Sequence, residues 1–109
     1  LQQTEPTLTL VTKAKVKACK TDVANHFMEK AHHACEYGFG LAPLYVGGGG
    51  TIGAIPEFQR IFPGKPVVLL AQSLMSDGYH APNEHFRLSQ ARNGIKTMAK
   101  YLNTIANHT

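Results

Sequence analysis

A chain of 109 residues, 43% of them hydrophobic and 17% charged, has room for one small domain with a buried core, which excludes wholesale disorder. The formal net charge of +4 gathers partly in four lysines near the start, but no aromatic residues alternate with them, so nucleic acid is not an expected partner. No apolar run is long enough to span a bilayer, so no membrane partner is expected either.

The two cysteines, Cys19 and Cys35, are too few for a disulfide framework and form no C-x-x-C pair, which excludes a structural zinc of the finger type. No signal-peptide pattern appears at the start. Reduced thiols without an export signal favour a cytoplasmic location.

Apolar and polar residues alternate from Thr7 to Cys19, and this period of two predicts a strand with one buried and one wet face. Lysines 13, 15 and 17 fall on the wet face. We interpret them as a solvated strand face that discourages edge pairing; the alternative is an anion-binding role.

A helix is predicted next, capped by Thr21 or Asp22 and ended by Gly38 or Gly40. Its apolar face would comprise Val23, Phe27, Ala31 and Ala34.

Two histidines of this helix, His26 and His33, lie on its opposite face, where they would be neighbours. A metal site there would need a third ligand, and the sequence offers none nearby. We therefore interpret both as solvated side chains.

The second half of the chain alternates apolar runs with helical patterns. Leu41–Val46 is a short apolar stretch, Ile55–Phe62 predicts a helix of two turns, and Val67–Leu70 is typical of a strand buried on both faces. A loop from Gln72 to Arg87 follows.

The last predicted element is a helix from Ser89 to Ala106, in which Gly94 suggests close packing. Its core stripe would comprise Ala91, Ile95, Met98, Leu102 and Ile105. The order of strand, helix, strand, short helix, strand and helix predicts an α/β fold with helices packed on a mainly parallel sheet.

The glycine run invites a nucleotide-binding interpretation, because residues 48–53 match G-x-G-x-x-G. The fit is weak: the helix after it is short, and the next strand is followed by Gln72 and Ser73 instead of an acidic residue for a ribose. Bare glycine backbone can instead bring consecutive N–H groups close to an anion such as a carboxylate.

His80 is the other candidate site residue. Pro82 pushes Ala81 out of the helical region, so His80 would lie on irregular backbone just beyond the carboxyl end of a buried strand, where α/β proteins bind ligands. The residues alone leave two interpretations open, an exposed loop side chain and a metal ligand.

Four segments together resemble the carboxyl end of a zinc metallopeptidase family. They are "GGGGTIGAIPEFQRIF", "PVVLL", "GYHAPNEHF" and the helix near "GIK". This family includes acetylornithine deacetylase, succinyl-diaminopimelate desuccinylase, aminoacylases and dipeptidases. The resemblance is nearest to the dipeptidase branch and covers roughly residues 21–106, while residues 7–20 are similar to the last strand of the family's inserted lid domain.

The resemblance implies a division of the chain into residues 1–20, the last strand of a lid or dimerisation domain, and residues 21–109, the carboxyl-terminal part of a catalytic domain. It implies that His80 ligates one of two zinc ions. It also implies that the substrate, a peptide or N-acyl amino acid, lies against Gly48, Gly49, Gly50 and Thr51, and that the complete enzyme is a homodimer formed through the lid.

The chain departs from the family in one large respect. The other metal ligands, an H-x-D segment, a Glu-Glu pair and a further acidic residue, are not in this sequence. We therefore expect a part of a longer enzyme that is inactive alone and that depends on the remainder of its catalytic domain. The alternative is a non-catalytic binding or assembly domain that keeps the peptidase fold.

Overall fold

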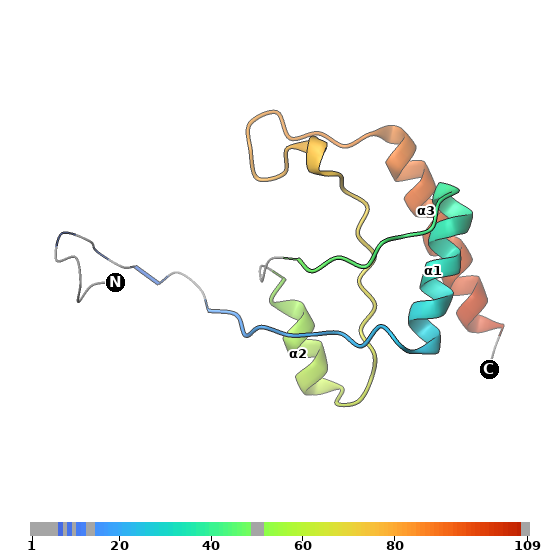
Figure 1. Cartoon of the computed structure of the whole chain (residues 1–109), viewed down its shortest axis with the longest axis horizontal. Helices are drawn as coiled ribbons and strands as arrows, with labels where there is room; N and C mark the ends of the chain where they lie inside the picture. The colour runs from blue at the N-terminus through green and yellow to red at the C-terminus, as the bar shows by residue number, and fades with distance from the viewer. Residues whose placement is uncertain (1–6, 8, 10, 13–14, 49–51, 108–109) are drawn as a thin grey trace.

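The computed structural model describes residues 7, 9, 11–12, 15–48 and 52–107. Within them it contains three α-helices and one short 3-10 helix, in the order α1 (His26–Phe39), α2 (Ala54–Ile61), η1 (Met75–Asp77) and α3 (Leu88–Ala106). Helices α1 and α3 pack side by side, and α2 lies apart from them across the extended segments of the chain (Figure 1).

The predicted α/β fold is wrong, because none of the described residues forms a strand. Residues 15–19 of the first predicted strand form an extended segment before α1, and residues 41–46 and 67–70 lie in extended segments that connect helices (Figure 1). No backbone hydrogen bonds join the described parts of these stretches to one another. Alternation and apolar runs favour extended backbone, but a strand also needs a neighbour that supplies the ladder of N–H and C=O partners.

Three extended segments nevertheless converge on one cleft of about 480 Å³. Its walls include Val16 from the first segment, Tyr45 from the second and Leu69 from the third. The first segment is also tied to α2, since the Gln59 side-chain amide donates to the Lys20 carbonyl at 3.2 Å. The boundary predicted between residues 20 and 21 stays a prediction.

Helix α1 begins later than the sequence pattern indicated. The Asn25 side chain caps it by accepting a hydrogen bond from the Met28 N–H at 3.0 Å. The Asp22 carboxylate instead accepts from the Ala24 N–H at 2.9 Å and so forms a turn before the helix. The helix ends as predicted at Gly40, whose φ of 75° is left-handed.

Close contact between α1 and α3 depends on a glycine. A Cβ added to Gly38 would overlap the Thr97 hydroxyl and lie 2.7 Å from the Asn93 carbonyl oxygen. The backbone of α1 therefore lies against a side chain of α3 at this position. Met28 and Ala31 are also buried on α1.

The residues predicted to form the buried face of α3 are not the residues that this helix buries. The residues that α3 buries are Gln90, Gly94 and Thr97, whereas Ile95 is 72% exposed and Leu102 is 58% exposed. Gly94 does pack closely, as predicted, because a Cβ there would overlap the Gln72 side chain. Successive residues point about 100° apart around a helix. The face that packs against α1 contains Gly94 and Thr97, each one position before a residue of the predicted stripe, so the stripe itself points elsewhere.

The described residues bury a small core, in contrast to the core that composition predicted. Its apolar side chains are Met28, Ala31 and Ala34. Helix α2 buries none of its side chains, and Phe58 and Ile61 lie exposed on it. In the described part of the chain, no helix has both the length and the apolar character needed to cross a membrane.

Candidate functional site

The predicted His80 loop lies between η1 and α3 and is drawn in orange in Figure 1. It leaves η1 through Gly78, whose φ of 64° is left-handed. The Ala81 N–H then donates to the Gly78 carbonyl at 3.1 Å, which closes a turn around His80. The sequence predicted both the loop and its irregular backbone correctly.

Asp77 anchors this loop and is almost fully buried, with 1% of its surface exposed. Its Oδ2 accepts hydrogen bonds from the Leu74 N–H at 2.7 Å and from the Gln90 side-chain amide at 3.2 Å. The Arg87 guanidinium lies 3.5 Å from Oδ1. The Leu74 hydrogen bond holds the pKa of Asp77 below its ordinary value against the opposing effect of burial, with help from Gln90, Arg87 and His85.

Gln90 joins the loop to the first turn of α3. Its side-chain amide donates to the Gln72 carbonyl at 2.7 Å as well as to Asp77. Its side-chain oxygen accepts from the Arg87 N–H at 3.3 Å, so it also caps the helix. The loop is therefore fixed to a helix packed against α1.

His80 lies exposed on this anchored loop with a left-handed φ of 64°. Among the described residues its imidazole has no hydrogen-bond partner, and its ring contact is an edge-to-face arrangement with Tyr79 at 5.8 Å between centroids. Asn83 is likewise left-handed, with φ 63°. Such backbone is uncommon for residues with a side chain and gathers at functional sites.

His80 therefore fits one position in a zinc site, because a ligand imidazole needs a free ring nitrogen and access to the ion. It does not complete such a site. The described residues contain no group of three or more His, Cys, Asp or Glu side chains that could hold a metal ion. The remaining ligands would have to come from elsewhere.

The glycine run is only partly described, because Gly49, Gly50 and Thr51 lie outside the described residues. Gly48 is exposed and lines the cleft of about 480 Å³ beside the extended segments. His80 does not line this cleft, nor the clefts among the described residues that lie beside His32, Lys65 and Arg60. That the glycine run and His80 share one cleft stays a prediction.

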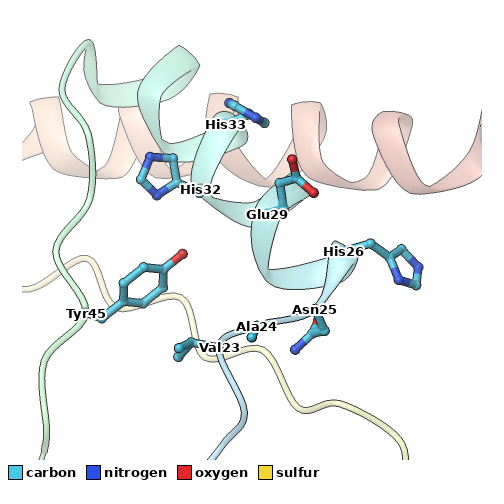
Figure 2. A pocket seen from close by; sticks show the side chains of 8 residues that line it. All are labelled: Val23, Ala24, Asn25, His26, Glu29, His32, His33 and Tyr45. Atoms are coloured by element: carbon cyan, nitrogen blue, oxygen red, sulfur yellow. The ribbon is translucent and has the colours of Figure 1, made fainter.

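A second histidine-bearing surface lies on α1 (Figure 2). There His32 and Tyr45 flank a cleft of about 600 Å³. His26 points away from His33, so these two residues do not form the pair that helical spacing suggested (Figure 2). His33 instead pairs with Glu36 at 3.1 Å, and His32 approaches the same carboxylate at 3.5 Å.

Three residues that anchor the loop, Asp77, Arg87 and Gln90, were not predicted from the sequence. Two signals could have found them. Asp77-Gly78 is a turn dipeptide, and Gln90 stands in the first turn of a helix, where a glutamine can cap the backbone.

Comparison of the chain with protein-family models, with curated proteins and with solved structures gave no match. The metallopeptidase resemblance thus rests on the sequence segments that carry it.

Proposed function

We propose that this chain is the carboxyl-terminal part of a zinc-dependent metallopeptidase, a dipeptidase or a related amide hydrolase, and that His80 is one of its metal ligands. The observation that carries the proposal is the exposed imidazole of His80, which has no hydrogen-bond partner among the described residues and is held on an anchored loop of left-handed backbone. This loop is also the "GYHAPNE" segment that resembles the family.

In this function each part of the chain has a limited role. The two zinc ions, when bound, would supply activation of the water that attacks the amide. His80 would hold one ion through a ring nitrogen. Gly48, with Gly49, Gly50 and Thr51, offers backbone N–H groups to the substrate carboxylate. The general base and the other ligands are not in this chain, so it is inactive alone.

The exposed apolar surface supports a larger catalytic domain around this chain. Ile95 and Leu102 on α3 and Phe58 on α2 present apolar side chains to solvent, although their spacing is that of a buried helix face. The remainder of the catalytic domain would cover them. The free thiols of Cys19 and Cys35 fit a reducing compartment, so the cytoplasm is the proposed location. The proposed homodimer, formed through the lid, is what the family resemblance implies.

The test is His80→Ala in the full-length protein, with bound zinc and dipeptide hydrolysis as the measurements. His33→Ala is the matched control, because His33 is also exposed but pairs with Glu36 on α1. We expect the His80 variant to lose most of its zinc and its activity, and the control to keep both. A His80 variant with full zinc content and full activity would remove His80 from the metal site. An unchanged full-length protein that neither binds zinc nor hydrolyses dipeptides would favour the non-catalytic domain.

A further inference from the structure

One residue closes the His80 loop at both ends. The Asp77 carboxylate accepts the hydrogen bond of the Leu74 N–H at 2.7 Å, on the side where the chain enters. The Asp77 carbonyl accepts the hydrogen bond of the His85 N–H at 2.9 Å, on the side where the chain leaves. The segment that carries His80 is thus held as a closed loop with Asp77 at its base.

The same residue is fixed to helix α3, so the base of the loop cannot shift freely. Gln90 donates to the Asp77 carboxylate at 3.2 Å, and the Arg87 guanidinium lies 3.5 Å from it. Arg87 also donates to the Ser76 hydroxyl at 3.2 Å, which adds a second link to η1. Binding residues are placed most accurately when packing and hydrogen bonds on rigid elements hold their backbone.

The loop also holds His80 in a conformation that it would not adopt by itself. A φ of 64° brings the Cβ of an L-residue too close to its own backbone, and such residues persist only where the surroundings impose the geometry. The turn closed by the Ala81 N–H and the Gly78 carbonyl places His80 at its third position, where the left-handed φ arises. The contacts of Asp77 hold the base of the loop that carries this turn, and so fix where the turn presents His80.

We infer that Asp77 is a positioning residue for His80: by closing the loop and tying it to α3, it fixes the left-handed backbone that presents the imidazole to a metal ion. The inference rests on the proposed function for the metal, but the loop geometry is measurable without one. The Asp77 carboxylate is engaged by Leu74, Gln90 and Arg87 at the base of the loop, so we assign it to the loop and not to the ion.

The variant that tests this is Asp77→Asn, which keeps the shape of the side chain. The asparagine oxygen can still accept from Leu74, but its amide nitrogen then places a donor beside the Arg87 guanidinium, where the carboxylate offered an acceptor. Asp22→Asn is the matched control, because Asp22 caps an exposed turn before α1. Arg87→Gln, which removes the ion pair and leaves the Leu74 and Gln90 hydrogen bonds, is a milder second variant.

Two sets of measurements on the full-length protein separate the loop from the metal. In the metal-free protein, we expect Asp77→Asn to weaken the strong amide-to-Hα contact that left-handed backbone gives His80 in NMR spectra, and to speed amide exchange at His85 about tenfold or more. In the metal-loaded protein, we expect zinc affinity to fall about 10- to 100-fold and the absorption bands of the cobalt-substituted site to change. Arg87→Gln should move the same signals less, and Asp22→Asn should move none.

The outcomes distinguish this inference from the proposed function. If His80→Ala loses zinc while Asp77→Asn keeps the His80 NMR signature and the zinc affinity, the positioning role fails and the metal role stands. If Asp77→Asn changes the His80 signature while His80→Ala keeps its zinc, the metal role fails and Asp77 remains the residue that shapes the loop. If Asp77→Asn does not fold, the Arg87→Gln result decides the same question.

Discussion

Gly38 of α1 packs directly against Thr97 of α3. The hydroxyl of Thr97 occupies the space where a Cβ on residue 38 would stand, and Thr97 itself is 1% exposed. Small residues at a helix crossing let two backbones approach until side chains of one helix touch the main chain of the other. This contact sets the position of α3, and through Gln90 it sets the position of the His80 loop.

Gly38→Ala should therefore destabilise the protein, although alanine favours helices. The new Cβ would overlap Thr97 and lie 2.7 Å from the Asn93 carbonyl, so the helices must separate. Overpacking of this kind costs about 1–3 kcal/mol, which exceeds the gain of about 1 kcal/mol from helix propensity. Urea unfolding measures the difference. Gly47→Ala is the control, because its Cβ would meet no atom within 4 Å; equal midpoints for the two variants would contradict the contact.

The helices could be predicted from the sequence because their signals are local. The cap at Gly40 and the period of α1 are encoded in a few adjacent residues. The direction of the α3 stripe could not be predicted in the same way. Ile95 and Leu102 form a regular apolar face, but α1 packs against the adjacent face, which contains Gly94 and Thr97. Periodicity indicates that a face is apolar and does not indicate which partner will cover it.

The prediction of a sheet was wrong because strand pairing is not a local property, and none of the described residues forms a strand. Val67–Leu70 has the composition of a buried strand, and Leu41–Val46 has similar apolar character, yet no backbone ladder joins these described segments. The candidate site was likewise predictable only in its local features. Pro82 and Gly78 predicted an irregular loop around His80, whereas the anchor at Asp77 depends on a partner, Gln90, thirteen positions away.

The two cysteines should differ in reactivity. Cys19 is exposed, whereas burial raises the pKa of the Cys35 thiol on α1. Since the thiolate is the reactive form, Cys35 should be alkylated more slowly than Cys19 at pH 8. Mass spectrometry of the folded protein during iodoacetamide treatment measures both rates, and the same reaction in urea is the control, where the two should become similar. Equal rates in the folded protein would mean that α1 does not shield Cys35.

The loop anchor should withstand mild acid. The Leu74 hydrogen bond is the main cause that lowers the pKa of Asp77, assisted by Gln90, Arg87 and His85 and opposed by burial. A lowered folded-state pKa means that the stabilisation is complete above the ordinary carboxyl value of about 3.9 and is lost as the pH falls through the lower folded value. An NMR titration of the Asp77 carboxyl carbon should thus have its midpoint below that ordinary value.

Removing a hydrogen-bonding or charged partner of Asp77 should raise the midpoint of its carboxyl titration. Gln90→Ala takes away one hydrogen bond to Asp77, and Arg87→Gln takes away the adjacent positive charge. Each variant should shift the Asp77 titration upward and leave the Leu74 hydrogen bond in place. A midpoint at or above the ordinary carboxyl value in the unchanged protein would show that burial outweighs the hydrogen bonds, and that the loop loses its anchor in weaker acid.

Gly48→Val tests the role of the glycine run in binding. A Cβ at Gly48 would meet no atom within 4 Å, so the valine fits the folded chain and should change its stability little. If the backbone N–H groups of this segment bind the substrate carboxylate, the branched side chain blocks that approach and raises KM in the full-length enzyme. Losing one charge-assisted hydrogen bond, worth about 1.5–3 kcal/mol, corresponds to a rise of roughly 10- to 150-fold.

Gly47→Val is the matched control, because residue 47 also has open space around it and precedes the segment assigned to the substrate. It should leave KM within about twofold of the unchanged enzyme. The kcat of Gly48→Val should fall less than its KM rises, because His80, the proposed metal ligand, is untouched. Comparing an N-acyl amino acid with its carboxamide isolates the carboxylate: the penalty should disappear for the amide. A Gly48 variant with unchanged KM for the free acid would place the substrate carboxylate elsewhere in the enzyme.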